Sequence, residues 1–429
     1  QLINILYNVV DRMYIGRIPG QGSLPLTGLG LCMPLISVII AFANLFGTGG
    51  APLCSIARGK GDLQGAERIL GNAFTMLLFT GILLTLLGLF FKKPLLYAFG
   101  ASDATYPYAD SYLSVYLLGT LFVMMGLGMN SYINAQGFAR IGMLTTLIGA
   151  VLNLLLDPLF LFVFHMGIRG AAIATVISQA ASVALCMIHL MGKGNVFTVE
   201  WRKIRFHGDM LREIIHNGLP SGVQNSVIGF ANVIVQSQIN SFGKLAMAAY
   251  GTHAKIEGFA FLPITSFNMA STTFISQNLG ARQYDRAKKG ARFSILSAML
   301  LAETIGVFCY VFAPKLIGLF DQNPGVIELG VRQARTVSLF FCLLAFSHAV
   351  AAVCRGAGKA FVPMCVMLAV WCLLRITYII AVMKLTNEIG YIYWAYPLTW
   401  SISSVIYLIY YLCCDWVHGF DKKTEKKAA

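Results

Sequence analysis

Long apolar runs separated by short polar segments dominate the sequence. A helix needs about 20 consecutive apolar residues to cross the hydrocarbon core of a bilayer. Several runs without Asp, Glu, Lys or Arg reach that length, among them residues 24–51, 69–91, 111–135, 170–192 and 391–414. Together with the weaker runs they predict an all-α integral membrane protein with twelve transmembrane helices, at residues 1–16, 24–51, 69–91, 106–135, 141–164, 170–192, 214–241, 245–276, 290–313, 330–354, 360–383 and 391–414.

The two halves of the chain repeat each other at a constant offset of 221 residues. Gly59 then aligns with Gly280, and Gly137 aligns with Gly358, each in a loop after an apolar run. Because each half contains an even number of helices, both halves enter the membrane from the same side, which makes the repeat parallel.

This repeat sets the expected domains. Residues 1–192 form a first six-helix lobe, 193–213 a linker, 214–414 a second lobe and 415–429 a tail. The seventh helix starts near residue 214, so we expect its counterpart, the first helix, to be truncated at the N-terminus of this sequence.

Composition supports a lipid environment and gives an orientation. The sequence is 57% hydrophobic and 12% charged, whereas soluble domains carry roughly 25% charged residues. Most of the 32 Lys and Arg fall in alternate loops, the linker and the tail. The positive-inside rule therefore predicts a multi-pass protein of the cell membrane with both termini in the cytoplasm. The net charge of +14 reflects this orientation and does not indicate a nucleic-acid partner.

The sequence offers little for enzymatic chemistry. The ten cysteines lie mostly within the expected spans and show no metal-binding spacing. Neither an HExxH nor a GxSxG motif occurs. We therefore expect no enzyme and no cofactor. The expected state is a monomer whose partner is membrane lipid.

Polar side chains inside the apolar runs are the candidate functional residues, because ionisable groups are costly at membrane depth. Asp11 lies in the first expected helix, with Tyr7 and Asn8 on the same face. Asp157 lies in the fifth, with Asn153 one turn before it. Amide and hydroxyl groups recur at helical spacing elsewhere: Asn130 with Asn134, and Thr175 with Ser178.

Acid, amide and hydroxyl groups are hard oxygen ligands that suit a proton or an alkali cation. At the 221-residue offset Asp11 aligns with Asn232, and Asp157 aligns with Tyr378. The polar group therefore belongs to the first half alone, which favours a coupling-ion or substrate role. The alternative is a buried hydrogen-bonded network that fixes helix packing.

The second half contains weaker candidates. Glu303 lies within the ninth expected helix and is a candidate second protonation site. His348, in the tenth, could titrate near neutral pH or could serve only in packing. Arg375, in the eleventh, is expected to pair with an acid of the same lobe that the sequence does not identify.

Four segments resemble motifs of the multidrug and toxic compound extrusion (MATE) family, in its prokaryotic branch. This family is part of the wider multidrug/oligosaccharidyl-lipid/polysaccharide exporter superfamily. The segments occur in the family's order and span most of the chain: LYNVVDRMYIG at 6–16, LNLLLDPLF at 152–160, GIRGAAIAT at 167–175 and GARQYDRA at 280–287.

The resemblance implies a V-shaped fold of two six-helix lobes. It also implies a secondary-active antiporter that exports organic cations and other amphipathic compounds in exchange for H⁺ or Na⁺. An alternative within the superfamily is a flippase for lipid or lipid-linked oligosaccharide. By motif position the cation, H⁺ or Na⁺, would bind at Asp11, Asn153, Asp157 and Thr175. The nearby substrate cavity would be lined by Tyr7 and Asn130, and we expect their neighbours Asn8, Asn134 and Ser178 to line it too.

Overall fold

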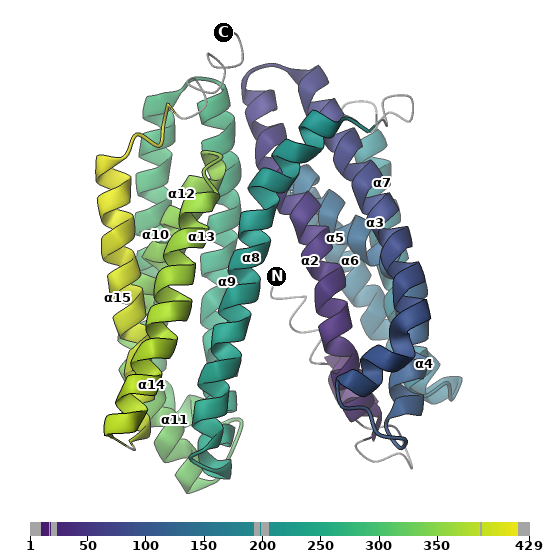
Figure 1. Ribbon diagram of the computed structural model, residues 1–429. Coiled ribbons are helices and arrows are strands. Elements are labelled where there is room, and N and C mark those ends of the chain that lie inside the picture. Colours follow the sequence, from purple (N-terminus) through teal and green to yellow (C-terminus); the bar gives the residue numbers. More distant parts are fainter. Residues whose placement is uncertain are drawn as a thin grey trace. The chain divides into compact units, whose positions relative to one another are not determined.

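The prediction of an all-α protein is confirmed. The computed structural model describes residues 10–16, 18, 24–192, 198, 206–386 and 388–418, and within these it contains helices and connecting turns only (Figure 1). The chain divides into two compact units, Gln1–Leu219 and Pro220–Ala429.

The first unit holds residues 10–15 of the first expected helix, and then helices that match the predicted spans in order. These are α2 (Leu24–Gly59), α3 (Leu63–Ala98), α4 (Tyr106–Leu118), α5 (Thr120–Ala135), α6 (Ala139–Pro158), the π-helical turn η1 (Leu159–Val163), α7 (Ile168–Met191) and the start of α8 (Gly208–Asn240).

The second unit holds the remainder of α8 and the last five predicted spans. Two of these spans consist of several helical segments each. The elements are α9 (Lys244–Gly280), α10 (Tyr284–Gly318), α11 (Pro324–Val337), the 3₁₀ turn η3 (Ser338–Phe340), α12 (Phe341–Gly356), α13 (Phe361–Met367), the π-helical η4 (Leu368–Leu374), α14 (Arg375–Leu385) and α15 (Ile389–Cys413).

The internal repeat is present in the structure. Shifted by 221 residues, the bounds of α5 coincide with those of α12. A side-chain hydrogen bond recurs at the same offset: Ser55 Oγ donates to the Ala135 carbonyl (3.3 Å), and Ser276 Oγ donates to the Gly356 carbonyl (2.9 Å). In both units a serine near the end of one long helix, α2 or α9, therefore hydrogen-bonds to the end of a later helix, α5 or α12.

Two expectations about individual spans were wrong. The predicted helix 106–135 is broken, because α4 and α5 meet at a 55° bend around Gly119. A Cβ on Gly119 would lie 2.3 Å from the Val176 side chain of α7, so the glycine lets the chain at the bend approach α7 closely. Several helices also extend beyond their apolar runs: α2 has 36 residues, about 54 Å, because a helix need not end at the membrane surface.

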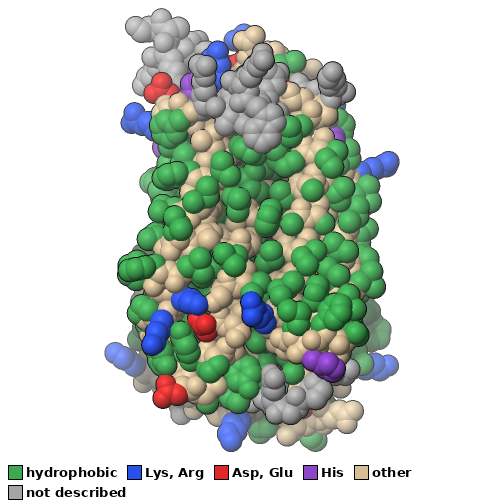
Figure 2. Space-filling model, turned by 90° about the vertical axis from the view of Figure 1, so that its right-hand side faces the viewer, with side chains coloured by type: hydrophobic (Ala, Val, Ile, Leu, Met, Phe, Trp, Pro, Cys, Tyr) green, Lys and Arg blue, Asp and Glu red, His purple; other side chains and the backbone are tan. Residues whose placement is uncertain are grey.

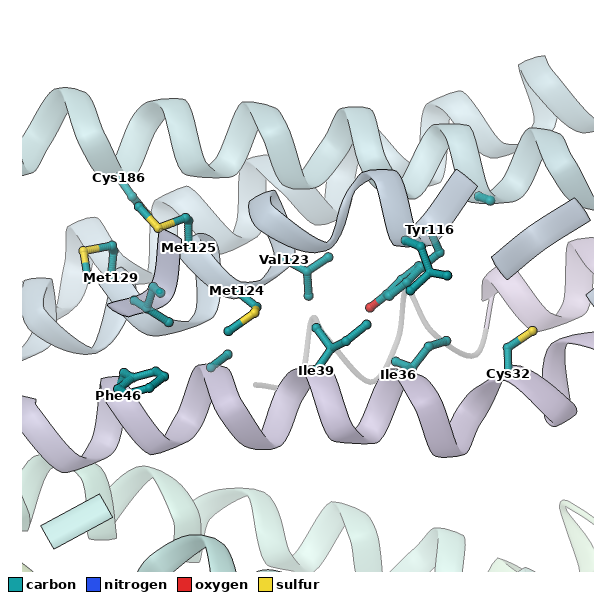
Figure 3. Packing of buried hydrophobic residues seen from close by; sticks show 14 of the residues in the cluster. Cys32, Ile36, Ile39, Phe46, Tyr116, Val123, Met124, Met125, Met129 and Cys186 are labelled. Carbon is teal, nitrogen blue, oxygen red and sulfur yellow. The ribbon is translucent and has the colours of Figure 1, made fainter. Parts of the chain in front are cut away.

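A hydrophobic surface surrounds a packed interior. Within the first unit, Ile36 and Ile39 of α2 point toward Tyr116 and Val123 across the core (Figure 3). Outward-facing residues such as Phe90, 79% exposed, are also apolar. On the face that Figure 2 shows, hydrophobic side chains cover the middle, and charged side chains lie mostly toward its two ends. Seven helices of the described chain are long and apolar enough to span a membrane, and the bent pair α4–α5 makes an eighth. The protein is therefore a multi-pass membrane protein.

The residues that follow α15 pack against the second unit. Trp416 and Val417 are each 4% exposed, and Trp416 stacks on Tyr411 with ring centroids 5.6 Å apart. The His418 backbone N–H donates to the Asp415 carboxylate (3.2 Å), which lowers the pKa of that carboxyl below its ordinary value. The start of the expected tail is thus anchored to the unit.

The first turns of α8 complete the first unit. A Cβ on Gly218 would lie 2.2 Å from the Leu45 carbonyl oxygen of α2, whereas a Cβ on Gly222 would meet no atom within 4 Å. Close approach of two helices through small residues is typical of membrane proteins.

We predict that Gly218→Ala destabilises the protein by about 1–3 kcal/mol, because the new methyl group must displace backbone. The matched Gly222→Ala change should be neutral or slightly stabilising, since Ala favours a helix over Gly. Thermal unfolding of detergent-purified variants measures both effects. Equal melting temperatures for the two variants would contradict this account of the contact.

Candidate functional site

Four polar residues from three helical segments come together inside the first unit. They are Asp11 of the helical residues 10–15, Asn153 and Asp157 of α6, and Thr175 of α7. Asp11, Asn153 and Asp157 are 8%, 2% and 1% exposed, and Thr175 is partly buried.

Asn153 links Asp157 to Thr175. Its Nδ2 donates to Asp157 Oδ1 (3.2 Å), one turn along α6, and to Thr175 Oγ1 (3.5 Å) on the neighbouring helix. Pro158 follows Asp157 and cannot donate to the carbonyl of Leu154, and the chain then widens into η1. The pair thus occupies the last turns of α6, next to a backbone oxygen that has lost its helical partner.

The two acids lie close enough for their carboxyl groups to interact directly. Asp11 Oδ1, Asp157 Oδ2 and Asn153 Oδ1 are buried and have no hydrogen-bond partner among the described residues. Two buried carboxylates cannot both remain charged at such a distance without compensation. The arrangement can therefore hold a proton between the acids or an alkali cation among the free oxygens.

The chemistry of the oxygens fits H⁺ or Na⁺. Carboxylate, amide and hydroxyl oxygens are hard ligands. In the part of the chain that the structure describes, no three His, Cys, Asp or Glu side chains gather as a transition metal would require. The adjacent Arg12 is exposed, and its Nη2 lies 3.9 Å from the sulfur of Met33, so it acts on Asp11 only through its charge.

Tyr112 of α4 is a further member of this site that the sequence analysis did not identify. It is 4% exposed, lies beside Thr175 and interacts electrostatically with Asp11. Its ring stacks on that of Tyr116, with centroids 6.0 Å apart. A signal was present in the sequence, since Tyr108, Tyr112 and Tyr116 recur every four residues and so share one helix face.

Asn130 and Asn134 lie elsewhere in the same unit. Asn130 Nδ2 donates to the Gly142 carbonyl (2.8 Å) and to Thr145 Oγ1 (3.0 Å), and Asn134 Nδ2 donates to Asn130 Oδ1 (3.1 Å). Gly142 lies 15 residues before Asp157 on α6, about 22 Å along the helix. These amides join α5 to the start of α6 and do not contact the acids.

The other first-half candidates have different outcomes. Ser178 is 3% exposed and lies one turn after Thr175 on α7, and its Oγ has no partner among the described residues. Ser178 can therefore contribute a further oxygen next to Thr175. Tyr7 and Asn8 lie outside the described residues.

The weaker candidates of the second unit are not part of this group. Glu303 Oε2 accepts from the Cys342 backbone N–H (3.0 Å), which satisfies a free donor in the first turn of α12. The His348 ring packs edge-on against Phe261 (4.9 Å) and Trp371 (5.3 Å). In this structure Glu303 caps a helix, and His348 belongs to an aromatic cluster.

We predict that Asp157→Asn raises the melting temperature of the purified protein by a few degrees, because it removes one of two buried carboxyl groups that repel each other when both are ionised. Asn153→Leu should lower the melting temperature, since it removes the donor to the Asp157 carboxylate. Thermal unfolding in detergent at neutral pH and without Na⁺ tests both changes. A lower melting temperature for Asp157→Asn would instead assign the group to helix packing.

A family model described as MatE matches residues 1–159 and 220–380 of this chain. The chain is 24% identical over 328 residues to the multidrug export protein MepA of Staphylococcus aureus (strain N315), covering 76% of this chain and 72% of that protein. It is 22% identical over 422 residues to the probable multidrug resistance protein YoeA of Bacillus subtilis (strain 168), covering 96% and 90%.

Solved structures share the fold. A crystal structure of MATE in the bent conformation superposes with a TM-score of 0.88 at 21% identity, over 99% of this chain and 93% of that one. An outward-facing conformation of a multidrug resistance MATE family transporter superposes with a TM-score of 0.88 at 21% identity, over 95% and 91%. The two-lobe arrangement of helices expected for the chain is therefore confirmed.

Proposed function

This chain belongs to the MatE family, and we propose that it is a secondary-active exporter of small amphipathic and cationic organic compounds. Two relatives that it resembles over most of their length are named for multidrug export or resistance. The apolar spans suit a carrier within the membrane rather than an enzyme. We further propose that it acts as a monomer in the cell membrane with both termini in the cytoplasm, as the distribution of Lys and Arg favours.

The observation that carries the proposal is the pair of buried acids, Asp11 and Asp157, whose carboxyl groups lie close enough to interact. Asp11 and Asp157 form the coupling site, and Asn153 and Thr175 help to hold the cation that binds to these acids. H⁺ or Na⁺ binds there because it relieves the repulsion between the two carboxyl groups. Tyr112 lies at the same place and offers a ring face to an organic cation.

Coupling follows from competition for the same negative charge. When the acids are both ionised, the site attracts a cationic substrate; when they hold H⁺ or Na⁺, that attraction is lost and the substrate is released. The change in charge also gives the coupling ion a different affinity for the inward-open and outward-open states. Such a difference is what a ligand needs to shift a conformational equilibrium. The carrier thus alternates between the two states and exports substrate as the ion enters.

We predict that an imposed pH or Na⁺ gradient drives accumulation of a fluorescent organic cation, such as ethidium, in everted membrane vesicles. Asp11→Asn and Asp157→Asn should each reduce the initial rate by tenfold or more, because an amide cannot exchange the charge. Asp209→Asn, which changes an exposed acid at the start of α8, is the matched control and should leave the rate unchanged. Immunoblotting of the vesicles verifies equal amounts of protein.

The gradient that supports transport identifies the coupling ion. Transport that survives both acid substitutions would refute the coupling site. If the unmodified protein transports no organic cation under either gradient, a lipid or lipid-linked oligosaccharide flippase becomes the better assignment.

A further inference from the structure

A buried arginine lies at the centre of the second unit. Arg375 begins α14, directly after the π-helical η4, and is 2% exposed. Its Nε and Nη2 both donate to one acceptor, Thr399 Oγ1 of α15, at 3.3 Å and 2.8 Å. A guanidinium has five N–H donors, and the remaining three have no partner among the described residues. Most of the hydrogen-bonding capacity of this cation is therefore unused.

Aromatic rings flank the guanidinium. Its Cζ lies 4.6 Å from the ring centroid of Tyr396 and 5.4 Å from that of Trp371. The hydroxyl groups of Tyr396 and Tyr250 are 2.7 Å apart, which brings α9 to the same place. These rings favour a desolvated cation and also provide a surface for an aromatic ligand.

No carboxylate of the described residues forms an ion pair with Arg375 within 4 Å. The acid that acts on it electrostatically is Glu257 of α9, and both Glu257 and Tyr250 are only partly buried. A buried cation without a directly bonded anion is unfavourable. On the side that faces α9, Arg375 thus has no directly bonded anion. The α9 residues on that side, Glu257 and Tyr250, are partly exposed to solvent.

The repeat shows what is unusual about this cluster. At the offset of 221 residues, Tyr396 is the counterpart of Thr175 and Thr399 is the counterpart of Ser178. In the first unit Thr175 bonds to Asn153, the partner of Asp157, whereas in the second unit Tyr396 and Thr399 contact Arg375. Arg375 itself aligns with Leu154, so the two halves differ in the buried charge that they carry here.

We propose that Arg375, together with Tyr250, Tyr396 and the displaceable Glu257, forms a binding site for the carboxylate of an aromatic organic anion. The guanidinium fork matches two oxygens of a carboxylate, and the incoming anion replaces Glu257 as the counter-ion. The flanking Trp371 and Tyr396 rings hold the aromatic body. The site adds anionic ligands to the proposed export function, but its occupancy can be measured without transport.

The test is equilibrium dialysis of 1-naphthoate and the uncharged 1-naphthamide against the full-length protein in phosphatidylcholine nanodiscs. We expect naphthoate to bind at least tenfold more tightly than naphthamide. Arg375→Gln should abolish this preference. Glu257→Gln should strengthen naphthoate binding several-fold, because the internal competitor is gone. Arg335→Gln, at an exposed arginine that also lies over a tyrosine ring, is the control and should change nothing.

The outcomes separate the proposal from its rivals. Equal binding of the two probes, or naphthoate binding that survives Arg375→Gln, would overturn it. Weaker or unchanged binding in Glu257→Gln would also overturn it and make Glu257 a permanent counter-ion; this variant remains informative if Arg375→Gln fails to fold. Loss of naphthoate binding when phosphatidylglycerol is added to the nanodiscs would assign the site to a lipid phosphate instead of an organic carboxylate. Because dialysis uses no ion gradient, a failure of ion-coupled export would not affect these results.

Discussion

The absence of water from the hydrocarbon core is the constraint on which this structure depends. Every backbone polar group there must be satisfied within the protein, so the chain consists of long helices and any interruption needs compensation. The compensation is visible at the α11–α12 break, where Glu303 accepts a backbone N–H. At Pro158 the interruption instead coincides with the buried acid of α6. Because helices are otherwise required in the membrane, the interruption at Pro158 draws attention to the candidate site at Asp157.

The two units show which features belong to the framework and which do not. The hydrogen bonds of Ser55 and Ser276 recur at the repeat offset, as do the left-handed backbone conformations at Gly137 and Gly358. These features lie at corresponding loops of the repeat, and they are present in both halves. The buried charges do not recur: Asp11 and Asp157 align with Asn232 and Tyr378, and Arg375 aligns with Leu154. A common scaffold thus carries different buried charges in its two halves.

Local patterns made part of this predictable from the sequence. The apolar runs predicted the membrane spans, and the constant offset predicted the repeat. The one-turn spacing of Asn153 and Asp157 predicted that these two members of the polar group lie on one helix face. Contacts between helices were not accessible in the same way. Asn130 has the same kind of spacing with Asn134, yet its partners are Gly142 and Thr145 on α6. Tyr112 was missed because its role depends on how α4 packs, and the need for a glycine at position 119 depends on a side chain of α7.

The contact between α2 and α8 has a consequence for the order in which the protein can be assembled. The first unit extends to Leu219, so six helices and their linker do not complete it; the opening turns of the seventh are also required. During synthesis, the surface around Leu45 and Gly49 remains uncovered until the ribosome has translated past Gly218. The first unit of this duplicated chain therefore contains the opening turns of the second copy. Its packing is complete only after the beginning of that copy has been translated.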